Sequence, residues 1–132
     1  MSPRVVTELV GVYHADGGVL GEVRYAVGRL TGRTHCALCD ITHAGVRRRP
    51  QWDDLVLGLG VPFTLVHLNE RAPDVARASG TATPCVLARC GDELVTVLPP
   101  AELEAAQADV VRFGVVLRTA LREADLVLTP GP

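Results

Sequence analysis

The sequence predicts one α/β domain with a central four-stranded mixed sheet flanked by helices. Short apolar runs rich in β-branched residues, typical of strands, alternate along the chain with segments whose apolar residues recur at helical spacing. The chain has 132 residues, of which 48% are hydrophobic and 21% charged, and this suits a single domain with a substantial core. Because no repeat, low-complexity tract or linker divides it, we expect one domain over 1–132.

The first strand is expected over Val5–Tyr13, a nearly continuous apolar run that suits a strand covered on both faces. The sequence His14-Ala-Asp-Gly-Gly breaks this run, and Asp16 is placed to cap a helix. Apolar residues then recur at helical spacing from Val19 to Leu30, and Gly32 is a suitable stop.

The middle of the chain predicts a helix, a strand and a second helix. Pro50 suits a first helical position, and the buried side of that helix is expected to be Trp52, Leu55, Val56 and Leu59. The second strand is expected over Pro62–Leu68, with His67 as a core residue. A short helix follows over Ala72–Ser79.

The C-terminal part predicts a hairpin followed by two helices. Strands are expected over Cys85–Arg89 and Leu94–Leu98, with a tight turn at Gly91 between them. A short helix begins at Ala101, and a longer one runs over about 109–123. The tail from residue 129 is expected to fray.

From Val61 to about Leu103 this order of elements resembles the thioredoxin fold. Asp74, Ala76, Gly80, Thr83-Pro84 and Gly91 stand where thioredoxin-like proteins carry the third helix, its glycine stop, the cis-proline and the hairpin turn. The resemblance covers roughly half the chain and implies a thioredoxin-like fold with a cis Thr83–Pro84 bond. It also implies that Thr83, Pro84 and Cys85 lie near Asp16 and form a region that contacts a substrate or partner, although Cys85 also suits a plain core position.

The first half departs from that resemblance in the position of its CxxC motif. Thioredoxins carry the motif between the first strand and its helix, where this chain has no cysteine; here Cys36-Ala-Leu-Cys39 follows the first predicted helix. The chain also resembles a small group of uncharacterised bacterial proteins. They share a VYxADxG-like opening, here Val12–Gly17, and a C-x-L-C-x-I-T-H-like segment, here Cys36–His43. This resemblance implies that both segments are functional and supplies no activity.

The cysteine–histidine segment is the strongest candidate site. In a helix, Cys36, Cys39 and His43 would share one face because they lie at i, i+3 and i+7. Such a dithiol can close a disulfide, with Cys36 attacking, Cys39 resolving, and His35 as a proton acceptor beside Cys36. The candidate catalytic residues are therefore Cys36, Cys39, His35 and His43.

Two other interpretations of the same segment stay open. Thiolates at Cys36 and Cys39 with the imidazole of His43 suit zinc or copper. Buried cysteine also behaves as a small hydrophobe, so the cluster could be core without chemistry.

Composition narrows the classes of function. A net charge of -2 predicts no general attraction to nucleic acid or to anionic membranes. All 13 basic residues are arginine, which excludes a lysine Schiff base and a Walker-type phosphate loop. No signal peptide or apolar span is visible, so we expect a cytoplasmic protein whose four cysteines are reduced.

These observations favour a small cytoplasmic thiol–disulfide redox protein that requires no cofactor. Its partner would be a protein or a small thiol or disulfide, and its oligomeric state stays open. The alternatives are a protein that binds zinc or copper and a thioredoxin-like accessory module without chemistry.

Overall fold

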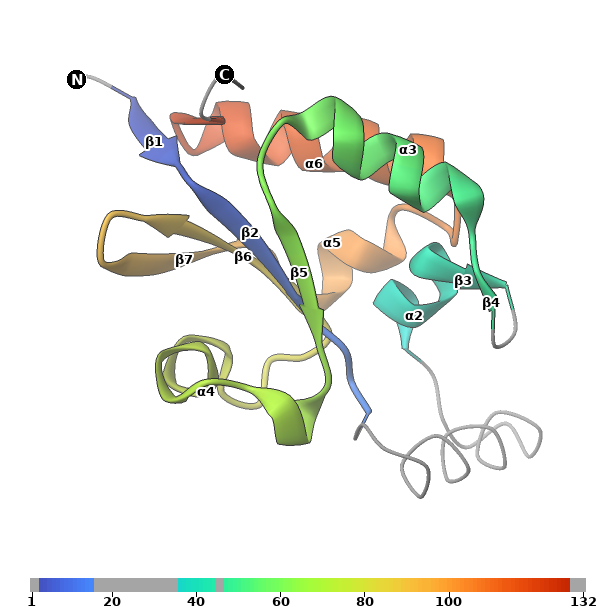
Figure 1. Ribbon diagram of the computed structural model, residues 1–132, viewed down its shortest axis with the longest axis horizontal. Coiled ribbons are helices and arrows are strands. Elements are labelled where there is room, and N and C mark those ends of the chain that lie inside the picture. Colours follow the sequence, from blue (N-terminus) through green and yellow to red (C-terminus); the bar gives the residue numbers. More distant parts are fainter. Residues whose placement is uncertain (1–2, 16–35, 45–46, 129–132) are drawn as a thin grey trace.

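The computed structural model describes residues 3–15, 36–44 and 47–128, which form an α/β fold around a four-stranded sheet (Figure 1). The strands lie in the order β5–β2–β6–β7. Strand β2 runs parallel to β5 and antiparallel to β6, and β6 runs antiparallel to β7. The sheet is therefore mixed, as the sequence predicts. The strand bounds are β2 (Glu8–Val12), β5 (Phe63–Val66), β6 (Cys85–Cys90) and β7 (Glu93–Leu98).

Strand β2 lies at the centre of the molecule and is buried on both faces. Leu9 packs into the larger hydrophobic cluster, whereas Val10 and Val12 pack into a second one with Val75. Because successive side chains of a strand point to opposite faces, the apolar run supplies both clusters. The prediction of a strand covered on both sides is confirmed.

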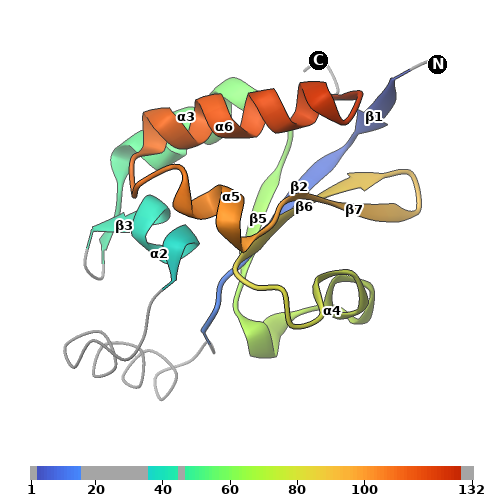
Figure 2. The same cartoon turned by 180° about the vertical axis from the view of Figure 1, so that it is seen from behind.

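Helices cover both faces of the sheet. Helices α3 (Pro50–Leu59) and α6 (Val110–Glu123) lie side by side on one face, together with α2 (Ala37–Thr42) and α5 (Pro100–Glu104) (Figures 1 and 2). Helix α4 (Pro73–Ser79) lies on the other. The ring of Trp52 packs 4.9 Å from Phe63 and 5.3 Å from Phe113, measured between centroids, and so joins α3, β5 and α6.

Several boundaries differ from the sequence prediction. The expected first strand is divided at Thr7 into β1 (Arg4–Val6) and β2, and β1 pairs in parallel with β8 (Leu126–Leu128), a strand that was not predicted. The second strand ends at Val66, and the 3₁₀ helix η1 (Leu68–Glu70) follows it. A short hairpin, β3 (His43–Ala44) with β4 (Arg47–Arg48), was also not predicted.

Other expectations agree with the structure or fall outside it. The hairpin of β6 and β7 turns at Gly91, which has a φ of 61°. The Thr83–Pro84 peptide bond is cis, as predicted. The predicted helix over 19–30 and the tail from residue 129 lie outside the described residues.

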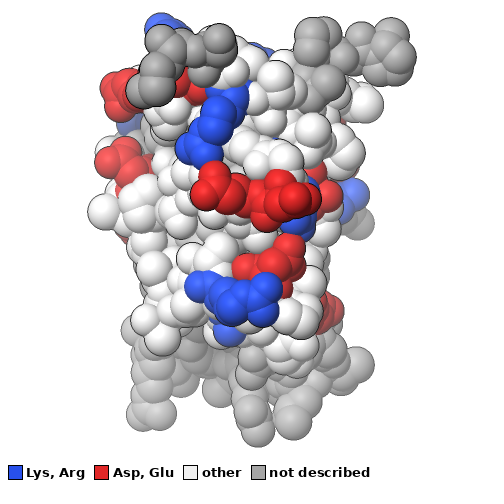
Figure 3. All heavy atoms as spheres, turned by 90° about the vertical axis from the view of Figure 1, so that its left-hand side faces the viewer, with Lys and Arg blue, Asp and Glu red and all other residues white. Residues whose placement is uncertain are grey.

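Charged side chains of both signs lie next to one another on the face that includes α4 and the β6–β7 hairpin (Figure 3). Arg4 on β1 bonds Glu93 on β7 at 2.7 Å, and Arg89 on β6 bonds Asp74 on α4 at 3.0 Å. These ion pairs join elements that are distant in the sequence. None of the helices in the described part of the chain has the length and apolarity for a membrane crossing.

Candidate functional site

The CxxC motif begins helix α2 and lies against the end of β2. Cys36 is the N-cap, with extended backbone, and its sulfur accepts the N–H of Cys39 at 3.3 Å. The N–H of His14, in the segment that follows β2, donates to the same sulfur at 3.4 Å. The CxxC motif is therefore distant from β2 in the sequence but lies beside the end of that strand in space.

The two sulfurs of the motif are in direct contact. The thiol of Cys39 donates to the sulfur of Cys36, and the two Sγ atoms are 2.6 Å apart. Cys36 has no exposed surface and Cys39 is half-buried. This exposure is the reverse of the predicted roles, because an attacking thiol must meet its substrate and Cys36 has no surface to do so.

The surroundings of Cys36 favour its thiolate. The hydrogen bond from Cys39 is the main cause that lowers the pKa of Cys36 to about 7, with help from the amides of His14, Cys39 and Leu38 and against the effect of burial. Burial raises the pKa of Cys85 to about 11, and Arg71 offsets only part of that rise. Near neutral pH, Cys36 is thus partly ionised and Cys85 is a thiol.

His43 does not share a helical face with the two cysteines. Helix α2 ends at Thr42, and His43 is extended and pairs with Arg48 in the β3–β4 hairpin. The prediction of positions i, i+3 and i+7 on one helix is therefore wrong, because strand pairing ends the helix first. Burial lowers the pKa of His43, with smaller contributions from Arg48 and His67.

The described ranges contain no group of three His, Cys, Asp or Glu side chains that could hold a metal ion. The predicted ligand set of Cys36, Cys39 and His43 is thus not brought together there. Instead, the His43 ring bonds through Nδ1 to the Thr42 hydroxyl at 2.6 Å and lies edge-on to the Tyr13 ring.

The residues expected to contact a partner are buried where the structure describes them. Thr83 is 8% exposed, Cys85 is fully buried and Pro84 is buried as well. Their side chains therefore offer almost no surface to a partner. His35 and Asp16, the other two predicted site residues, lie outside the described residues.

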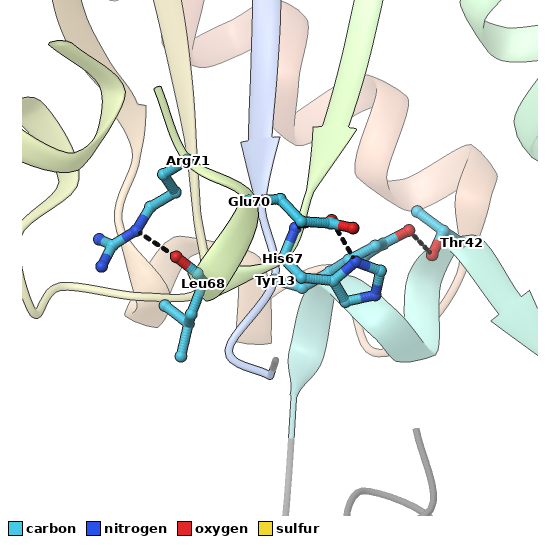
Figure 4. Close-up of polar contacts among 6 residues, drawn as sticks. All are labelled: Tyr13, Thr42, His67, Leu68, Glu70 and Arg71. Atoms are coloured by element: carbon cyan, nitrogen blue, oxygen red, sulfur yellow. Dashed lines mark hydrogen bonds and ion pairs between the residues drawn. The ribbon is translucent and has the colours of Figure 1, made fainter. Parts of the chain in front are cut away.

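A tyrosine–histidine cluster lies at the ends of the parallel strands β2 and β5 (Figure 4), and the Tyr13 phenol is close enough to be influenced by Cys36 and Cys39. The Tyr13 hydroxyl is 2.9 Å from the Thr42 hydroxyl, and the Tyr13 ring lies 5.0 Å from that of His67. Nδ1 of His67 is 2.6 Å from a Glu70 oxygen. Burial raises the pKa of Tyr13 although the bond to Thr42 opposes it, so the phenol stays neutral.

This cluster corrects one expectation and adds residues that sequence reasoning missed. His67 is not a core residue of a strand: it follows β5, caps η1 and keeps 28% of its side chain exposed. Tyr13 and His14 belong to the Val12–Gly17 segment that the resemblance marks as functional, and ligand sites of α/β sheets form at the carboxyl ends of parallel strands. Their contacts with α2 are long-range and leave no local pattern.

We compared the chain with protein-family models, curated proteins and solved structures, and none of them matches it.

Proposed function

We propose that this chain is a thiol–disulfide redox protein with a thioredoxin-like fold, in which Cys39 meets the substrate and Cys36 is its buried partner. The observation that carries the proposal is the 2.6 Å separation of the two sulfurs. Sulfurs in contact across one helical turn can form a bond with little movement of the backbone, and one thiolate of the pair is available near neutral pH.

The strand order supports the thioredoxin-like part of the proposal. The order β5–β2–β6–β7, with one parallel and two antiparallel pairs, makes a four-stranded mixed sheet, and a sheet of this kind is what the expected thioredoxin-like fold contains. The cis Thr83–Pro84 bond directly before β6 agrees with it, as does a dithiol at the start of a helix beside the end of the central strand.

The reaction we propose is the reduction of a substrate disulfide in two exchange steps. The pair shares a proton, so its transfer from Cys39 to Cys36 gives a Cys39 thiolate. That thiolate attacks the substrate disulfide, and a mixed disulfide forms as the first substrate thiolate leaves and takes up a proton. Cys36 then loses its proton and attacks the Cys39 sulfur, which releases the second substrate thiol. The pair gives two electrons and its single proton to the substrate, the second proton comes from water, and a Cys36–Cys39 disulfide remains.

Redox titration tests the proposal directly. The protein is equilibrated in reduced and oxidised glutathione at a series of ratios, alkylated, and examined by peptide mass spectrometry. We expect a Cys36–Cys39 disulfide to form in the wild type and to be absent in Cys39→Ser. Cys90→Ser is the matched control, because Cys90 is also half-buried but lies outside the pair.

Two results would argue against a redox role. One is a pair that stays reduced at every glutathione ratio, which would favour an accessory module without chemistry. The other is stoichiometric zinc or copper in the protein purified without chelator and lost in Cys39→Ser, which would favour the metal-binding alternative.

A further inference from the structure

We propose that His14 is a positioning residue for the dithiol: its ring, anchored to the Thr83 hydroxyl, holds its backbone N–H on the sulfur of Cys36. The inference rests on the proposed function and adds to it a second segment of chain that controls the buried sulfur. His14 touches no substrate in this scheme and acts only through Cys36.

The His14 amide differs from the other amides that donate to the Cys36 sulfur, because it needs a separate contact to hold it in place. The amides of Leu38 and Cys39 belong to the first turn of α2, so they reach the N-cap sulfur wherever this helix forms. The His14 amide comes from the other side, 22 residues earlier in the chain. Its direction depends on how the chain leaves β2.

The segment after β2 is held from two sides. The N–H of Tyr13 donates to Val66 at 2.9 Å, and Ala15 accepts the N–H of Leu68 at 2.8 Å, so the neighbours of His14 are joined to the β5 side of the sheet. Nδ1 of the His14 ring bonds the Thr83 hydroxyl at 2.8 Å, on the β6 side. Because Thr83 is 8% exposed and only Pro84 separates it from β6, this anchor is itself held firmly.

The other groups that face Cys36 do not obscure the contribution of the His14 amide to the thiolate population of Cys36. The Cys39 thiol is the strongest influence on the Cys36 sulfur, and the buried Tyr13 phenol, which also feels both sulfurs, stays neutral. A loosened His14 amide therefore appears as a change in thiolate population at an otherwise unchanged site. A structural role alone would change stability and leave the titration of Cys36 as it is.

The test removes the anchor and leaves the amide. Thr83→Val deletes the hydroxyl at nearly constant shape, Thr83→Ser keeps it as the matched control, and His14→Leu deletes the ring nitrogen at an exposed position. The reduced proteins, labelled with ¹³C at cysteine Cβ, are titrated by NMR. We expect Thr83→Val and His14→Leu each to reduce the Cys36 thiolate fraction at pH 7 by about two- to fivefold, the effect of one weakened hydrogen bond. Thr83→Ser should titrate like the wild type.

A double variant tests whether His14 and Thr83 act through one shared contact. His14→Leu with Thr83→Val should shift the titration no further than either change alone, because both remove the same contact. A wild-type titration in either single variant overturns the inference, and His14→Leu decides alone if Thr83→Val does not fold. The measurement needs no redox partner, so it gives its answer even if the glutathione experiment fails.

Discussion

At the scale of single residues, the main feature is an ionisable sulfur that is fully buried. A buried thiol ordinarily resists ionisation, as Cys85 does with a pKa raised to about 11. Cys36 has the same exposure, yet its pKa is lowered to about 7. The difference is in the donors: hydrogen bonds from a thiol and from backbone amides stabilise the Cys36 thiolate, whereas among the described residues Arg71 alone opposes the effect of burial on Cys85.

The dependence of Cys36 on Cys39 can be tested by a matched pair of substitutions. Cys39→Ala removes the strongest donor, so the Cys36 pKa should rise toward its ordinary value of 9.0. Cys39→Ser keeps an O–H donor and should retain most of the lowering. Titration of the ¹³C-labelled Cys36 Cβ measures both. Equal pKa values in the two variants would contradict the assigned cause.

The lowered pKa also predicts how stability depends on pH. A group with a folded pKa of about 7 and an unfolded pKa of 9.0 contributes stability that is fully present above pH 9 and is lost as pH falls to 7. The full contribution should be about 3 kcal/mol in the free energy of unfolding, and about 2 kcal/mol of it should be lost between pH 9 and pH 7. Urea denaturation of the reduced protein, compared with Cys36→Ala at each pH, isolates it from the other cysteines. A constant difference between the two proteins from pH 7 to 9 would contradict it.

At the scale of elements, the contact between α2 and the sheet depends on a glycine in β2. A Cβ at Gly11 would lie 2.8 Å from Leu65 Cδ2 and 3.1 Å from Leu38 Cδ2 and Phe63 Cε1. Leu38 is fully buried in α2 and has little room to move. A methyl group at position 11 would press first on Leu65 of β5 and then on Leu38 of α2, so glycine lets both elements pack closely against β2.

A pair of glycine substitutions tests this close approach. Gly11→Ala should destabilise the protein by about 1–3 kcal/mol, the usual cost of overpacking a core. Gly58→Ala, in α3 with open space around it, should stabilise by about 0.5 kcal/mol because alanine is the better helix former. The midpoints of chemical denaturation measure both. A neutral Gly11→Ala would mean that α2 can move away from β2 at little cost.

Helices and turns were predictable where the pattern of their own residues decides them. They were less predictable where pairing with a distant segment decides them. Apolar spacing predicted the helix from Pro50 and the hairpin turning at Gly91, since each is decided by its own residues. The short helix at the dithiol was extended too far, because pairing of His43 with Arg48 lies outside the helical pattern. Likewise, the contact of His14 with Cys36 joins segments that no local signal connects.

At the scale of the whole molecule, β8 joins the last described residues to the first strand. Its register places Leu126 opposite Arg4 and Leu128 opposite Val6. A three-residue strand at the end of a helix gives almost no sequence signal, and its partner lies at the opposite end of the sequence, which explains why it was not predicted. Leu126 nevertheless belongs to the larger core.

The contribution of β8 can be measured with two neighbouring residues. Leu126→Ala should lower the free energy of unfolding by about 2–4 kcal/mol because Leu126 is 3% exposed and packs in the core. Val127→Ala, at a position 43% exposed in the same strand, should change it by less than about 0.5 kcal/mol. Thermal or urea denaturation compares them. Similar losses in both would contradict the assignment of the contribution of β8 to the burial of Leu126.

The two fully buried cysteines lie in different hydrophobic clusters, Cys36 in the larger one and Cys85 in the one beneath α4. The reactivity of each cysteine therefore reports on the opening of a separate hydrophobic cluster. Pulse alkylation in mild denaturant, read out by mass spectrometry, would follow the loss of protection at each thiol in one experiment. Simultaneous labelling would indicate that the two clusters open cooperatively. Labelling at different denaturant concentrations would identify the cluster that opens first.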